Sequence, residues 1–245
     1  MANRLPLHQI YRDNVEDLPR ELERTKDRTS RNQMLIMLGL EGTLRTIAVC
    51  RYVLFGDVDG FRQYMRESLD VNFSMVDRYE QGESNFATAV NTYGYASLFN
   101  ALAVGEHALA ERFVERWTTH SLPKRGEHPF ARLLAHALYR VVMDHSEADQ
   151  RVTDFEAYFA AGKDKASRGY GTTLRGIVNR DPALTDIGLA EILNGHKRLS
   201  SGSGRFALTV DEDLCVWGVG LANLARMKRL SVDPKHPLVP SALLI

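Results

Sequence analysis

The clearest hydrophobic pattern in the chain lies between Tyr95 and Trp117, where two apolar helical runs flank Gly105. Residues three or four positions apart lie on the same side of a helix, and apolar residues follow that spacing on both sides of the glycine. They are Leu98, Ala101 and Leu102 before it, and Ala110, Phe113 and Val114 after it. Glycine often ends a helix because it adopts the left-handed backbone conformation at little cost. The pattern therefore predicts a helical hairpin of the kind stacked in tetratricopeptide-like proteins.

A second hairpin is predicted beyond residues 120–129, a polar segment that contains two prolines and a glycine. The apolar triad that begins at Leu134 repeats the triad that begins at Leu98, at a shift of 36 residues. The shift is not kept beyond the next turn, because Phe113 and Phe155 are 42 residues apart. The spacing therefore favours related but irregular packing units over a consensus repeat.

Other helices are predicted by apolar runs with recognisable ends. Residues 34–55 are apolar almost all round, which is typical of a helix buried on several sides, and Gly56 ends that run. The Asp-Pro pair at 181–182 is a strong helix start. We further expect Pro19 to open a second short helix rather than to interrupt a long one. Thr209 is expected to cap the last clear helix.

The final segment, residues 231–245, carries three prolines and ends in two leucines and an isoleucine. We expect it to pack on the helices, because a free tail rarely ends in such apolar residues. Taken together, the pattern predicts an all-α fold: an irregular stack of helical hairpins, tetratricopeptide-like in part. Residues 1–245 are interpreted as a single all-helical domain, with the segment at 120–129 as the candidate boundary.

Composition and charge narrow the classes of partner. Hydrophobic residues make up 44% of the chain and charged residues 25%, and 31 basic residues balance 31 acidic ones. A chain without net charge has no global electrostatic attraction to nucleic acid or to an anionic membrane, and we expect neither as a partner. The N-terminal residues lack the apolar core of a signal peptide. Charged residues interrupt the only membrane-span candidate, at 34–55, so we expect a buried helix and a cytoplasmic protein.

Residues that could carry chemistry do not form a recognisable motif. His120, His128, His136 and His145 are eight or nine positions apart, whereas a helical metal pair needs three or four. Cys50 and Cys215 lie in apolar runs and are interpreted as core residues. The glycine-containing segments at 168–176 and 200–205 lack the Walker spacing and a preceding strand. We therefore expect no catalytic residue, no metal and no cofactor.

Acidic residues gather at three predicted helix starts, and two interpretations stay open for them. Carboxylates at a helix start bind free N–H groups and offset the helix dipole. Alternatively, they could form acidic edges that bind a basic partner. The candidate partner-binding residues are Asp57 and Asp59; Asp144, Glu147 and Asp149; and Asp211, Glu212 and Asp213.

The C-terminal segment DLCVWGVGLANLARMKRLSVDPKHPLVPSALL, residues 213–244, resembles the immunity protein 49 family. The resemblance lies in a helix rich in small residues, a basic helix end, and a proline-containing tail that finishes in leucines. It implies an all-helical bacterial protein of a polymorphic toxin system. Such a protein binds one cognate toxin and neutralises it by occlusion, without turnover. The resemblance covers the final third of the chain best, and no set of toxin-contacting residues is carried over.

Two other classes of function stay open from the sequence. A tetratricopeptide-like adaptor or chaperone would hold a peptide in a concave groove, and a regular repeat would favour it. A helical enzyme would be recognised by a pocket in which polar groups with shifted pKa values converge.

Overall fold

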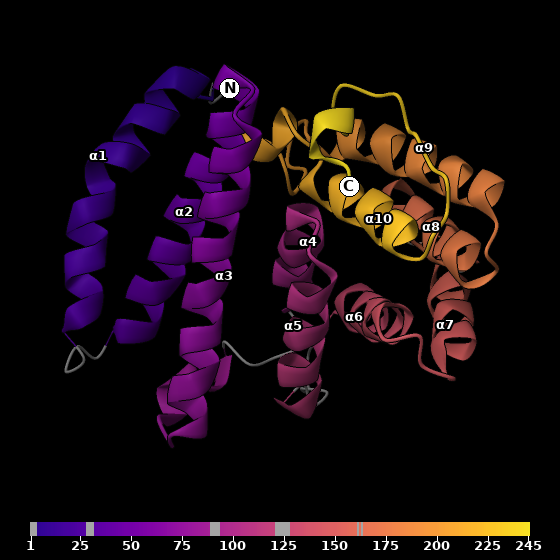
Figure 1. The fold of residues 1–245 in the computed structure, drawn as a ribbon, viewed down its shortest axis with the longest axis horizontal. Helices are drawn as coiled ribbons and strands as arrows, with labels where there is room; N and C mark the ends of the chain where they lie inside the picture. Colours follow the sequence, from indigo (N-terminus) through magenta and orange to yellow (C-terminus); the bar gives the residue numbers. More distant parts are fainter. Residues whose placement is uncertain (1–3, 28–31, 89–93, 121–127, 161, 163) are drawn as a thin grey trace.

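The computed structural model describes residues 4–27, 32–88, 94–120, 128–160, 162 and 164–245. Within these ranges the fold is all-α, with ten α-helices and no strand, which confirms the predicted fold class (Figure 1). Figure 1 shows α1, α2 and α3 side by side at one end, α4 and α5 in the middle, and α6–α10 at the other end.

The connections between the α-helices differ in length, from two residues between α2 and α3 to the segment 200–215 between α9 and α10. Their bounds are α1 Leu7–Lys26, α2 Gln33–Phe55, α3 Val58–Glu80, α4 Tyr95–Val104, α5 His107–His120, α6 Pro129–Val142, α7 Ala148–Ala160, α8 Arg168–Val178, α9 Pro182–Leu199 and α10 Val216–Met227. Short 3-10 turns lie at η1 Ser84–Thr88, η3 Lys165–Ser167, η4 Val210–Glu212 and η5 Ser241–Leu243.

The two predicted hairpins are present and adjacent. Gly105 ends α4 in the left-handed conformation (φ 87°), and α5 follows after one further residue. Helices α6 and α7 form the second hairpin, and α6 packs against both α4 and α5. Buried apolar residues on both sides of the 120–129 segment belong to one core cluster. The candidate boundary itself lies largely outside the described residues.

Helix α2 is sandwiched between α1 and α3, and its second half is deeply buried, with Ile47 and Ala48 at 0% exposure. Its first half keeps an open face, since Leu35 is 61% and Leu38 39% exposed. The expected burial on several sides therefore holds only from about Leu40 onward. Among the described helices, α2 alone is long and apolar enough to cross a membrane, and half of its most apolar window is buried in the protein.

Several predicted helix ends are confirmed by their geometry. Gly56 ends α2 with a left-handed φ of 65°, and the Asp57 side chain accepts a hydrogen bond from the Gly60 N–H at 2.8 Å. The Asp181 side chain likewise accepts from the Leu184 N–H at 3.0 Å, where α9 begins. These side chains bind N–H groups that have no partner within the helix.

Two expectations about helix ends are wrong. Pro19 lies inside α1 instead of opening a second helix. No residue of α1 is buried, so the carbonyl that loses its partner at the proline can be hydrated. Thr209 caps only the short turn η4, while α10 begins at Val216. The segment between η4 and α10 is bound to the C-terminal tail, because the Cys215 N–H donates a hydrogen bond to the Leu238 carbonyl.

Helices α8 and α9 make a very close pair. A Cβ atom on Gly176 would lie 2.5 Å from the backbone nitrogen of Thr185, and one on Gly188 would lie 2.4 Å from that of Thr173. Glycine at both positions is what allows the two backbones to approach this closely. The connection between the helices is a three-residue turn, residues 179–181.

Helix α10 joins the C-terminal part of the chain to α4. The rings of Trp217 and Phe99 stack at a centroid distance of 4.8 Å. The fully buried Asn223 amide donates to the carbonyl of Leu102 at 3.1 Å and to that of Leu243 at 3.2 Å, and its oxygen accepts from the Ile245 N–H. Leu243 is fully buried, which confirms that the tail packs against the helices.

Replacing Asn223 by leucine is expected to lower the free energy of unfolding by about 2–4 kcal/mol, because buried backbone groups of two other segments lose their partner. Urea denaturation followed by circular dichroism measures this. The exposed Asn194 on α9 provides the control, and Asn194→Leu should change stability by less than about 0.5 kcal/mol. Equal effects of the two substitutions would contradict the role assigned to Asn223.

Candidate partner-binding cleft

A cleft of about 490 Å³ opens where α2, α4 and α10 meet the segment 205–211. Its volume lies in the range of small-ligand and side-chain pockets. The lining combines charged, amide and aromatic side chains from four separate parts of the chain. They include Glu41, Arg45, Tyr95, Asn100, Arg205, Phe206, Asp211 and Trp217.

The floor of the cleft is crossed by an ion pair. The Arg45 Nη2 atom lies 2.5 Å from Asp211 Oδ1, and Arg45 Nε donates to the Asn100 oxygen at 3.4 Å. Burial acts to lower the pKa of Arg45, but the charge and hydrogen bond of Asp211 outweigh it and raise that pKa. Arg45 therefore remains charged and occupied with a partner of its own chain.

Glu41 lies one helical turn before Arg45. Burial raises the pKa of this carboxyl group, while the nearby Arg45 charge and hydrogen bonds from Ser68 and Asn72 act to lower it. The Ser68 hydroxyl donates to Glu41 Oε1 at 3.1 Å. Glu41 is thus a half-buried carboxyl group that accepts a hydrogen bond from a side chain of the same protein.

His196 of α9 contacts two residues of the segment 205–211. Its Nε2 lies 2.6 Å from the Asp211 carbonyl oxygen, and its ring stacks on Phe206 at 4.6 Å between centroids. Because a carbonyl oxygen only accepts, Nε2 carries the proton in this contact. His196 is 2% exposed, and this burial lowers the pKa of the imidazole below its usual value.

Aromatic rings also line the cleft. Trp217 contacts Tyr95 and Phe206, each at 5.5 Å between ring centroids. The Arg205 guanidinium lies 4.9 Å from the Phe130 ring centre and 5.7 Å from that of Trp217, within cation–π range. The Trp217 ring lies at 76° to the Tyr95 ring and at 89° to the Phe206 ring, and all three side chains are buried. The exposed Arg205 places a cation beside this aromatic cluster.

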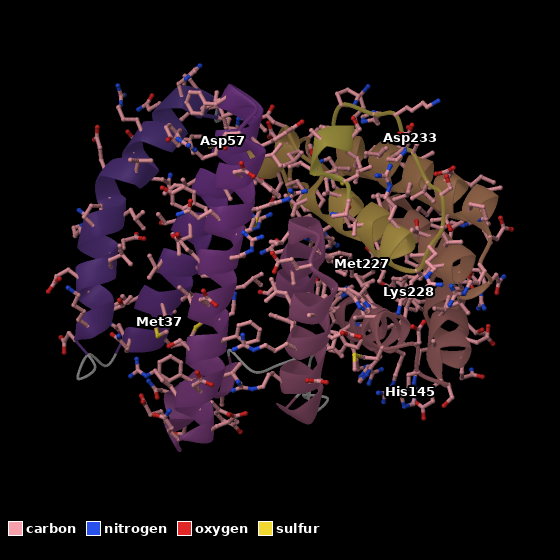
Figure 2. The ribbon with its side chains drawn as sticks, in the orientation of Figure 1. Met37, Asp57, His145, Met227, Lys228 and Asp233 are labelled. Atoms are coloured by element: carbon pink, nitrogen blue, oxygen red, sulfur yellow. The ribbon has the colours of Figure 1, made fainter. Side chains whose placement is uncertain are left out.

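The predicted acidic clusters lie at three different places. The α2–α3 turn and the α6–α7 turn are far apart, as the labels Asp57 and His145 show in Figure 2. The structure brings only Asp211 into the cleft. Asp59 lies exposed in the first turn of α3.

The other acidic candidates contact basic side chains of the same chain. Asp57 pairs with Arg51, and Asp149 with Arg175. Asp144 lies 2.6 Å from the buried Lys228 ammonium. Glu147 contacts Arg140 and Arg151, and Arg4 contacts Glu212 at 3.1 Å and Asp213 at 2.7 Å. These contacts give the clusters a role within the fold, and whether they also bind a partner stays a prediction.

Most residues of the cleft were not predicted as a site from the sequence. Glu41 and Arg45 stand out there only as charges that interrupt an apolar helix, which is the one local signal that pointed to them. Cys50 and Cys215 are buried as expected, and burial raises the pKa of both thiols to about 12. They are therefore core residues rather than nucleophiles.

The chain matches no protein-family model, no curated protein and no solved structure.

The lowered pKa of His196 predicts a pH dependence of stability. The imidazole takes up its proton at a higher pH in the unfolded chain than in the folded one. The contribution of the neutral, buried imidazole to the free energy of unfolding is therefore complete above about pH 6.5, and it is lost as the pH falls through the folded-state pKa. The free energy of unfolding should therefore drop less between pH 7.5 and 5 in His196→Gln than in the wild type. Urea titrations across this range measure it, and parallel curves would contradict the assignment. His8→Gln, at an exposed position of α1, serves as the control.

Proposed function

We propose that this protein is a cytoplasmic immunity protein that binds a cognate toxin protein and neutralises it by occlusion, without turnover. The observation that carries the proposal is the cleft between α2, α4 and α10, because its composition suits recognition of a protein side chain. Binding energy in protein interfaces concentrates in buried tryptophan, tyrosine and arginine residues. Trp217, Tyr95 and Arg205 occur together in this cleft.

The charges of the cleft support recognition over turnover. Arg45 is bound to Asp211, and Glu41 accepts a hydrogen bond from Ser68. Groups that already hold a partner inside the chain shape and orient a surface, and they are less available for proton or group transfer. The same contacts keep the cleft in a defined conformation, which lowers the entropy cost of binding.

The segment that resembles the immunity protein 49 family supports the same proposal. It forms α10 and the tail, and it supplies Trp217 to the cleft. The segment that carries the resemblance therefore also forms part of the cleft. A stable interface buries about 800 Å² on each partner. The toxin would therefore also contact the surface around the cleft.

One observation favours a second candidate function, a helical enzyme. Glu41 lines a cleft, and burial raises the pKa of its carboxyl group, as is common for a general acid. The two functions are separated by Glu41→Gln, which keeps the hydrogen-bonding shape of the side chain but cannot transfer a proton as a carboxyl group does. Undiminished protection against the toxin in this variant favours the immunity proposal, and loss of protection with intact toxin binding favours the enzyme.

The proposal is tested with the product of the adjacent reading frame, if that frame encodes a toxin with a variable C-terminal domain. Wild-type protein should bind the toxin domain and protect cells that co-express it. Arg205→Glu reverses the charge beside the aromatic cluster and should weaken binding at least tenfold, or about 1.4 kcal/mol. Isothermal titration calorimetry measures the affinity.

Arg198→Glu is the matched control, because Arg198 is also an exposed arginine but lies on α9 outside the cleft. It should bind like the wild type. If the wild-type chain fails to bind the toxin, the immunity proposal is wrong. If both variants bind equally well, the cleft is not the binding surface.

A further inference from the structure

We infer that a groove between α2 and α3, next to the end of α1, is a docking site for a lysine side chain of a partner protein. Its apolar floor takes the aliphatic stem of the lysine, and Asp70 at its rim pairs with the ammonium group. The groove has a volume of about 300 Å³ and shares no lining residue with the cleft. The inference therefore goes beyond the proposed function and does not depend on it. Met37, which lines the groove, is labelled in Figure 2.

The floor of the groove is apolar. Met37 and Leu40 of α2 line it together with Val71 of α3. Met37 and Val71 belong to a small apolar cluster that is separate from the main core. A lysine side chain commonly lies with its aliphatic stem along an apolar surface and its charged head in water. A groove with an apolar floor and an open rim suits this shape.

The uncompensated charge of the groove is negative. Its lining contains one carboxylate, Asp70, and one guanidinium, Arg78. The charge of Arg78 is compensated, because Glu83 accepts from its Nε at 3.0 Å and from its Nη2 at 2.6 Å. Asp70 is exposed, and among the described residues no basic side chain pairs with it. Arg66, one turn earlier on α3, pairs with Glu106 instead. The carboxylate at the rim therefore favours a cationic ligand.

Gln33 provides a second, independent observation. It lies one turn before Met37 on α2, and its amide nitrogen donates at 2.7 Å to the carbonyl of Thr25, a residue that lines the groove. Its side chain is 0% exposed, and within the part of the chain that the structure describes its oxygen accepts no hydrogen bond. A buried acceptor without a donor leaves a partial negative charge uncompensated. That charge stabilises a cation in the adjacent groove and disfavours an anion.

The test compares three probes that share one aliphatic chain and differ in charge: n-pentylammonium, n-pentanol and n-pentanoate. NMR of ¹³C-methyl-labelled methionine follows Met37 at the groove, and Met227 at the end of α10 serves as the internal reference (Figure 2). Pentylammonium should shift the Met37 signal saturably and bind about threefold more tightly than pentanol. Pentanoate should bind more weakly than pentanol. Raising NaCl from about 20 to about 500 mM should weaken pentylammonium binding and leave pentanol binding unchanged, because salt screens an exposed ion pair.

Variants assign the binding to the rim and to the floor. Asp70→Asn should lower the affinity for pentylammonium to that for pentanol. Asp59→Asn is the matched control, because Asp59 is also an exposed carboxylate of α3 but lies outside the groove, and it should bind like the wild type. Val71→Thr makes the floor more polar at nearly constant size and should weaken all three probes. Absence of a saturable Met37 shift, equal binding of pentanoate, or an unchanged preference in Asp70→Asn would each overturn the inference.

A peptide separates a lysine side chain of a partner from a free amine. N-acetyl-leucyl-lysinamide should shift the Met37 signal and bind at least as tightly as pentylammonium. Its counterpart with an acetylated ammonium group should bind about threefold more weakly. If pentylammonium shifts the signal and the peptide does not, the groove takes free amines only and the docking inference is wrong. These measurements need no toxin, so the immunity proposal and the docking inference fail or stand separately.

Discussion

The close crossing of α10 over α4 is the constraint on which the rest of the structure depends. A Cβ atom on Gly220 would lie 2.8 Å from the Phe99 carbonyl oxygen, so only glycine allows this approach. One turn further on, Asn223 donates to the carbonyls of Leu102 and Ala103 and ties the tail to the same place. Because Trp217 lies at the start of α10, the crossing also sets the position of the aromatic cluster.

The Arg45–Asp211 pair extends this connection to the N-terminal helices. The two residues are 166 positions apart in sequence, and both side chains are largely buried. Breaking a buried pair leaves one uncompensated charge, which commonly costs about 3–5 kcal/mol. The pair therefore holds η4 against α2 and at the same time fixes the floor of the cleft.

How much could be predicted from the sequence depends on how local each signal is. The hairpin at Gly105 and the start of α9 at Asp181 depend on residues within one or two helical turns, and both were predicted. Pro19 was misread because a proline is tolerated in a helix that is packed on one side only, and that packing is not visible locally. The Thr209 hydroxyl does accept a hydrogen bond from the Asp211 N–H, but it caps a turn of three residues, and the local sequence does not distinguish such a turn from the start of a longer helix.

The cleft could not have been predicted in this way. Its residues come from positions 41–45, 95–100, 205–211 and 217, and no periodic pattern connects them. The acidic clusters were visible because they are contiguous, yet most of them contact basic residues that lie far away in sequence, such as Asp144 with Lys228. Sequence shows where charges gather, whereas tertiary packing decides which of them are left for a partner.

The α8–α9 pair has a consequence for the order in which the molecule assembles. Its two helices are joined by a three-residue turn and meet through reciprocal glycine contacts, so only a short loop must close to form it. The contact between Asn223 and Leu102, in contrast, closes a loop of 121 residues, and such distant contacts form slowly. The hairpin can therefore nucleate early, while the cleft exists only after the long loop has closed. Ligand binding at the cleft would accordingly report the completed fold and would be absent from a chain that has formed its hairpins alone.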